Sequence, residues 1–315
     1  MRYSRDLNGV KMNRISKIFA LIFNILVLSG ISSISTARAE DALRVFVSIV
    51  PQKYFVEKIG GEFVDVSVMV RPGASPATYE PKPRQMVALS KARIYFAIGV
   101  PFENTWLKKL AAANPKMMVV HTEDGIEKIP MKTRHHHDEE KYHHKNKGRH
   151  HYGIKNPHVW LAPPLVMIQA RNILGALTRV DPANRAVFET NYKNFIRELV
   201  ELDLKIRDIF AGKEEGKKFM VYHPAWGYFA GAYGLKQIPV EIEGKEPTPK
   251  QLQNLIRHAG EDGVKVIFVQ PQFSAKSAEI IAKAIGGQVV FSDPLSLNWA
   301  ENLIAVAEKF KEVLK

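Results

Sequence analysis

Seven histidines fall within the seventeen residues from His135 to His151, although the whole chain has only eleven. The imidazole ring is the commonest protein ligand for zinc and similar ions. The tract lies inside the chain and is interrupted by acids and lysines, which distinguishes it from a purification tag. Its composition indicates binding of a divalent metal, and a solvated polar loop without a specific role is the alternative.

Three isolated side chains offer a second set of metal donors. His223 directly follows the apolar run FMVY, Asp293 follows VVFS, and His158 precedes the stretch VWLAP. In open α/β sheets, ligands bind beyond the carboxyl ends of the strands. Two imidazoles and one carboxylate suit zinc, with a fourth position open or filled by water. A lone histidine or aspartate at such a place can also satisfy the local backbone, so position alone leaves both interpretations open.

The chain after residue 40 alternates apolar strands with helical segments. Strands are predicted at 44–50, 64–70, 92–99 and 116–121, and helices at 52–60, 83–91 and 102–112. Repeated β–α units of this kind predict a parallel sheet with helices on both faces. A further helix is predicted at 164–179, after the histidine tract, and Asp181-Pro182 ends it.

Residues 184–210 contain neither proline nor glycine and carry apolar side chains at helical spacing. At 1.5 Å per residue this predicts a helix of about 40 Å, long enough to connect two lobes. The pattern then repeats, with strands predicted at 217–224, 264–271 and 288–294 and helices at 247–260, 274–285 and 299–315. We therefore expect an N-terminal α/β lobe at 40–180, a connecting helix at 181–211 and a C-terminal α/β lobe at 212–315.

The first 39 residues have the pattern of an export signal. A basic stretch precedes an apolar run from Ile18 to Leu28, and Ala37-Arg38-Ala39 forms an A-x-A cleavage site. The apolar run is shorter than the roughly 20 residues that cross a bilayer. We expect cleavage after Ala39 and, because the chain has no cysteine for a lipid anchor, a protein free in the periplasm. An uncleaved anchor is the alternative.

The composition excludes cysteine-based sites and indicates which kinds of partner to expect. A chain without cysteine has neither disulfides nor thiolate zinc sites. The formal net charge is +13, but lysine and glutamate are interspersed along the predicted helices and no nucleic-acid motif is present. The charge therefore indicates a solvated surface rather than a nucleic-acid partner.

Five segments together resemble one family. They are PGASPATYEPKPRQ (72–85), NPHVWL (156–161), YHPAWGYFAGAYGL (222–235), PVEIEGKEPTPKQL (239–252) and FSDPLS (291–296). In this order they are similar to the periplasmic metal receptors of ABC importers, the ZnuA/TroA-like solute-binding proteins. The resemblance implies two Rossmann-like α/β lobes with parallel sheets, joined by one long rigid helix, with the metal in the cleft between them. A histidine-rich loop before NPH is typical of the zinc-specific branch.

The resemblance also implies which residues hold the metal. His158 matches the family's second ligand, His223 the third and Asp293 the fourth. The third ligand is histidine in zinc receptors and usually glutamate in manganese or iron receptors. The first ligand is a histidine in the pattern S-P-H-x-Y-E-P, where this chain has Ala77.

A methyl group cannot bind a metal, so three protein ligands would be left. Water could complete the site, Gln52 or Glu80 could substitute for the missing ligand, or a histidine from 135–151 could fold in. Of these we favour water or a histidine of the tract.

The function expected from this resemblance is a periplasmic receptor that binds Zn²⁺ as cargo and delivers it to an ABC permease in the inner membrane, most simply as a monomer. A manganese- or iron-selective receptor of the same family and a periplasmic zinc buffer or chaperone are the alternatives. A metal hydrolase would also suit two histidines and an aspartate. The chain lacks an HExxH motif and a general base placed by a motif, so we expect a binding protein rather than an enzyme.

Overall fold

The computed structural model describes residues 42–131, 155–212, 216–241 and 245–314. The expected export signal (1–39) and the histidine tract (135–151) lie outside these residues. Within them, no helix combines the length and the apolar character needed to cross a membrane.

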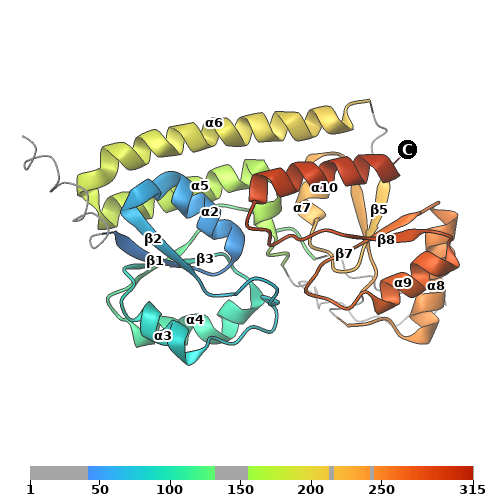
Figure 1. Ribbon diagram of the computed structural model, residues 1–315, viewed down its shortest axis with the longest axis horizontal. Helices are drawn as coiled ribbons and strands as arrows, with labels where there is room; N and C mark the ends of the chain where they lie inside the picture. Colours follow the sequence, from blue (N-terminus) through green and yellow to red (C-terminus); the bar gives the residue numbers. More distant parts are fainter. Residues whose placement is uncertain (1–41, 132–154, 213–215, 242–244, 315) are drawn as a thin grey trace, which may run out of the picture. The chain divides into compact units, whose positions relative to one another are not determined.

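The first sheet is parallel and has the strand order β2-β1-β3-β4 (Figure 1). Its strands are β1 (Leu43–Val47), β2 (Val64–Val68), β3 (Ile94–Ala97) and β4 (Met118–His121). The helices between them are α2 (Val50–Gly60), the 3-10 turn η1 (Gly61–Phe63), α3 (Pro83–Leu89) and α4 (Pro101–Ala113). The central strand β3 is buried along its whole length, as expected for a strand covered on both faces.

The second sheet is also parallel and has the order β6-β5-β7-β8. Its strands are β5 (Lys218–Val221), β6 (Lys236–Pro239), β7 (Val266–Val269) and β8 (Gln288–Phe291). Its helices are α7 (Gly227–Ala232), α8 (Pro249–Glu261), α9 (Lys276–Ala284) and α10 (Trp299–Val313). The two sheets have the same strand order along the chain, which confirms the expected repetition of the β–α pattern.

Sequence reasoning missed α7 and β6. Gly231, Gly234 and Pro239 interrupt the apolar pattern there, and the strand has only four residues. Pro239 is tolerated because β6 lies at the edge of its sheet, where a missing N–H donor is left on the open side. The helix predicted at 247–260 is observed as α8, which begins at Pro249 after the N-cap residue Thr248 and ends at Glu261.

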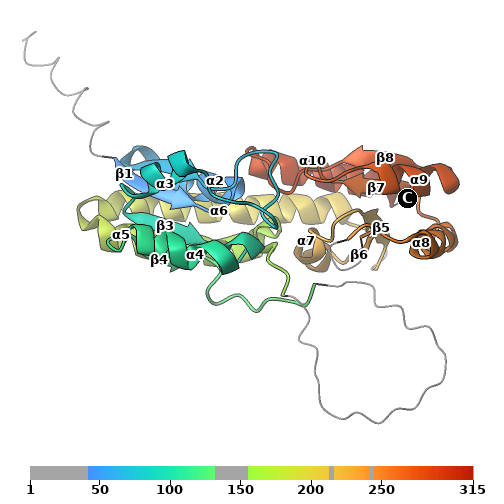
Figure 2. The ribbon, with the colours of Figure 1, turned by 90° about the horizontal axis from the view of Figure 1, so that it is seen from below.

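Two helices lie between the sheets in the chain, α5 (Pro163–Val180) and α6 (Arg185–Phe210), with the 3-10 turns η2 (Val159–Leu161) before them and η3 (Pro182–Asn184) between them. The 26 residues of α6 span about 39 Å. In the first half of α6, Phe195 packs against Phe55 of α2. At the last residue of α6, Phe210 packs against Phe229 of α7. Figures 1 and 2 show α6 running past both sheets. The prediction of two α/β lobes with one long helix is confirmed.

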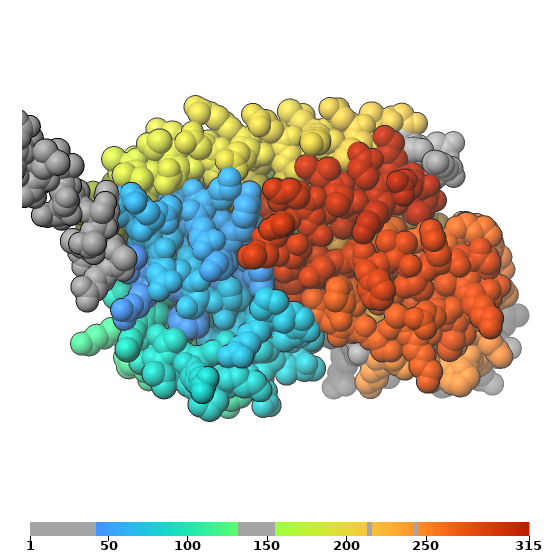
Figure 3. Space-filling model, viewed as in Figure 1, coloured from blue at the N-terminus to red at the C-terminus, as the bar shows by residue number. Residues whose placement is uncertain are grey.

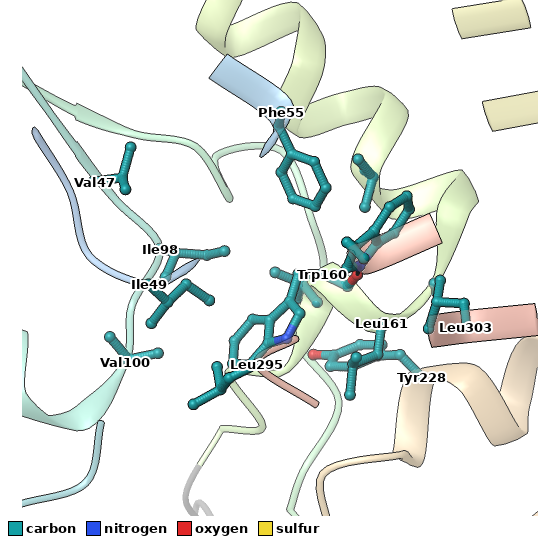
Figure 4. Close-up of a cluster of buried hydrophobic side chains, with 14 of the residues drawn as sticks. Val47, Ile49, Phe55, Ile98, Val100, Trp160, Leu161, Tyr228, Leu295 and Leu303 are labelled. Atoms are coloured by element: carbon teal, nitrogen blue, oxygen red, sulfur yellow. Dashed lines mark hydrogen bonds between the residues drawn. The ribbon is translucent and has the colours of Figure 1, made fainter. Parts of the chain in front are cut away.

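Buried tryptophans connect the two halves. The indole N–H of Trp160 donates to the carbonyl of Pro294 (2.7 Å), and the indole N–H of Trp299 donates to the carbonyl of Trp160 (2.8 Å). Figure 4 shows Trp160 among apolar side chains from both halves, and the two halves abut on the face drawn in Figure 3. Among the described residues, the larger of two apolar clusters contains residues from both sheets. The segments that carry the candidate ligands are therefore fixed by a shared core.

Candidate metal centre

The structure brings His158 and His223 together, although 65 residues separate them. His158 stands directly before η2 and is 7% exposed, and His223 follows β5. Their Nε2 atoms are 3.3 Å apart, and their ring centroids 5.1 Å. Two nitrogens bound to one tetrahedral zinc at 2.0–2.1 Å are separated by about 3.3–3.4 Å. The spacing of the two rings therefore fits a single zinc ion between them.

The other nitrogen of each ring has an acceptor of its own. Nδ1 of His158 lies 2.7 Å from Oδ1 of Asn156, which also accepts the backbone N–H of His158. Nδ1 of His223 lies 2.7 Å from Oε1 of Glu241. Because both partners accept, each Nδ1 carries the proton and each Nε2 lone pair is left for a metal. Two lone pairs that face each other at 3.3 Å are stabilised by a cation placed between them.

The surroundings keep His158 in the neutral form that binds metals. Burial of its ring, followed by the neighbouring ring of His223, holds the pKa of His158 well below its usual value. Aromatic side chains orient both imidazoles: Trp160 lies 5.1 Å from the His158 ring, and Phe273 stacks on His223 at 4.9 Å.

The two histidines open into a cavity of about 390 Å³. Most of its lining is apolar and comes from both halves of the chain, including Val100, Phe273 and Leu295. Ala77 also lines the cavity, so the position that the resemblance assigns to the first ligand does face this space. At this position the chain presents a methyl group instead of a donor.

Asp293 does not join the two histidines in this structure. Its Oδ1 accepts the side-chain N–H of Gln272 and the backbone N–H of Leu295, both at 2.9 Å. Within the described ranges, no three histidine, aspartate or glutamate side chains are close enough to hold one metal. Asp293 nevertheless immediately precedes Pro294 and Leu295, which line the cavity, and no described residue donates to its Oδ2. Its role as a ligand stays a prediction.

The structure also bears on the alternatives for the missing ligand. Gln52 is fully buried and its amide is already used, because Oε1 accepts the N–H of Ser48 and Nε2 lies 3.2 Å from the carbonyl of Ala97. Gln52 is therefore not available to a metal. Glu80 is exposed and is not part of the cavity lining. The histidines of 135–151 lie outside the described residues, so this alternative stays open.

Sequence reasoning missed the residues that orient the donors, namely Asn156, Glu241 and Gln272. The register of the second sheet would have found one of them. Val221 of β5 pairs with Pro239 of β6, so His223 and Glu241, each two residues further on, extend from neighbouring strand ends. Because β6 was missed, this juxtaposition was missed as well.

Replacing Glu241 by alanine is expected to weaken zinc binding by about 10- to 100-fold, the usual cost of losing the partner of a metal-binding histidine. The His223 ring would lose the acceptor that fixes its tautomer. Glu241→Gln retains an oxygen that accepts from Nδ1 and is expected to lose less. Competition with a chromogenic chelator measures both affinities, and equal losses in the two variants would contradict the positioning role.

The chain is similar to known metal-binding proteins. The profile of the family described as ZnuA, zinc-uptake complex component A, periplasmic, matches residues 45–313. The high-affinity zinc uptake system protein ZnuA of Bacillus subtilis (strain 168) is 29% identical over 281 residues, which cover 87% of this chain and 86% of that protein. The iron-binding protein YfeA of Yersinia pestis is 25% identical over 291 residues, which cover 88% of each chain.

A solved crystal structure of a ZnuA protein superposes with a TM-score of 0.79 at 42% identity, covering 87% of this chain and all of that chain. The profile match extends over most of the chain. It includes His158, His223 and all the residues that line the cavity. The chain therefore belongs to the family of zinc-uptake complex component A, the periplasmic metal-binding receptors of ABC importers.

Proposed function

We propose that this protein captures Zn²⁺ in the cavity beside His158 and His223 and delivers it to the permease of an ABC importer in the inner membrane. The observation that carries the proposal is the 3.3 Å separation of the two Nε2 atoms, each on a ring whose Nδ1 already has an acceptor. This arrangement offers two oriented nitrogen donors to one ion. The similarity to the zinc uptake protein of Bacillus subtilis supports the same cargo.

The donor types favour zinc over manganese or iron. Imidazole nitrogen suits zinc, whereas manganese is bound mainly by carboxylate, carbonyl and water oxygens. His223 occupies the position at which manganese and iron receptors usually have glutamate. Because an iron-binding protein is among the relatives, the choice of metal is the first property to test.

The proposed ligand set is His158, His223 and Asp293. A shift of the Asp293 side chain would present Oδ2 to the metal while Oδ1 keeps its bonds to Gln272 and Leu295. With three protein donors, the ion keeps a coordination position for an exchangeable ligand. A cargo protein needs such a site, since it must release what it binds.

The chemistry proposed here is binding rather than catalysis. A hydrolase would need a base free to take a proton from a metal-bound water. Glu241, the buried carboxylate nearest the histidines, is instead engaged with Nδ1 of His223. The proposal includes a monomer, exported with cleavage after Ala39, with lobes at 40–180 and 212–315 and the connecting segment 181–211.

Native mass spectrometry of the purified protein with Zn²⁺, Mn²⁺ and Fe²⁺ in competition tests the proposal. One Zn²⁺ per chain, retained against an excess of the other ions, is expected. Preferential retention of manganese or iron would contradict the choice of cargo. Several weakly bound zinc ions that are lost when residues 135–151 are deleted would indicate a zinc buffer instead.

A further inference from the structure

The cavity beside the two histidines is much larger than one metal ion requires. Its volume of about 390 Å³ corresponds to roughly a dozen water molecules. Volumes of about 300–1,000 Å³ with mainly apolar walls and a few polar groups are typical of sites for small organic ligands. The polar side chains in the lining include Ser75, Asn104 and Lys155.

The protein also supplies too few donors for a closed zinc site. His158 and His223 provide two nitrogens, Asp293 would provide one oxygen, and the cavity wall at Ala77 provides none. A tetrahedral zinc ion needs four ligands. At least one coordination position therefore faces a cavity that has room for an organic ligand.

The charges favour an anionic group as this ligand. Both imidazoles are neutral when they bind a metal, so Zn²⁺ held by them and by Asp293 keeps a net positive charge. Glu241 also lines the cavity and offsets one positive charge, while the Lys155 ammonium adds one, so a net positive charge remains around the open coordination position. A carboxylate on the incoming ligand would bind the metal or pair with Lys155, and so balance the charge.

We propose that the site takes zinc as a chelate, in which a small amino-acid-like ligand fills the coordination position beside Ala77. Its nitrogen and carboxylate oxygen complete the metal's coordination, and its apolar part packs against the walls formed by Val100 and Phe273. The proposal rests on the proposed function and names the form in which the cargo arrives.

L-Histidine is the probe, because it carries an amine, an imidazole and a carboxylate. Native mass spectrometry of the full chain with Zn²⁺ and L-histidine is expected to give a 1:1:1 complex of protein, zinc and histidine. Titration with the preformed zinc–histidine complex is expected to give an affinity at least about tenfold above that for zinc alone, after correction for chelation in solution. Detection of bare zinc only, in the presence of saturating histidine, would overturn the proposal.

Two substitutions at Ala77 sharpen the test. Ala77→His supplies a fourth protein donor, so zinc alone is expected to bind more tightly and the histidine-containing complex to disappear. Ala77→Leu occupies a similar space without a donor and is expected to lose the ternary complex while keeping zinc. A ternary complex that is equally populated in wild type and both variants would place the histidine elsewhere and overturn the proposal.

The outcomes separate this inference from the proposed function. If one zinc ion binds per chain through His158 and His223 and no added L-histidine binds with it, the proposed function stands. The chelate proposal is then wrong. A ternary complex that forms only after deletion of 135–151 would mean that the chain's own tract fills the position, and would likewise overturn the chelate. Failure of zinc to bind with or without histidine would remove the proposed function itself.

Discussion

Zinc binding is expected to fall by more than about 100-fold when either His158 or His223 is replaced by alanine. Loss of an orienting partner alone typically costs 10- to 100-fold, and these substitutions remove a donor itself. Each variant leaves one imidazole and the proposed Asp293 carboxylate, one donor fewer than the three protein ligands of a typical open zinc site. Competition titration with a chromogenic zinc chelator measures the loss for each variant.

His121→Ala is the matched control. This histidine ends β4, is half-exposed and contacts Glu123 at 3.3 Å. Its removal is expected to leave zinc affinity unchanged. If the His158 and His223 variants kept wild-type affinity and deletion of 135–151 abolished binding, the paired imidazoles would not be the zinc site.

A second large effect is expected on stability. Trp299→Ala is expected to lower the free energy of unfolding by about 3–5 kcal/mol, the range for removing a large buried aromatic side chain. The Trp299 ring is 1% exposed and meets the Phe55 ring edge-on at 4.9 Å, and its N–H donates to the carbonyl of Trp160. The substitution therefore removes packing and a buried hydrogen bond between the two halves. Urea unfolding followed by circular dichroism measures the change.

Leu204→Ala serves as its control, because Leu204 lies on α6 and is 55% exposed. Its effect is expected to stay within about 0.5 kcal/mol, as for most surface positions. Equal losses in the two variants would mean that Trp299 does not connect the halves as described. Because Trp299 lies outside the cavity lining, a folded Trp299→Ala protein is expected to keep its zinc stoichiometry.

Most of the fold could be predicted because its elements are long or strongly patterned. The 26 residues of α6 carry an uninterrupted apolar stripe, and β3 is a continuous apolar run. The short strand β6 could not be recognised, because its stability comes from pairing with β5 rather than from its own sequence. The glycine and proline residues around β6 are typical of loops, so the local sequence predicts a loop there rather than a strand.

The candidate site was predictable only in part, and for a related reason. His158 and His223 follow from the ends of elements and from the motifs around them, and the structure brings their Nε2 atoms to 3.3 Å. The position of the Asp293 side chain depends on hydrogen bonds from Gln272 and Leu295. These bonds could not be predicted from the local sequence pattern. The ring orientations likewise depend on Asn156 and Glu241, whose contacts exist only after folding.

The larger apolar cluster has a consequence for the folding of the chain during its synthesis. Phe195 and Phe210, from opposite stretches of α6, belong to it together with Trp160 and Trp299. Neither sheet with its own helices would seal this interior, so a fragment that ended after the first sheet would expose tryptophan and phenylalanine to water. A nascent chain must therefore be synthesised to its last helix before the interior closes.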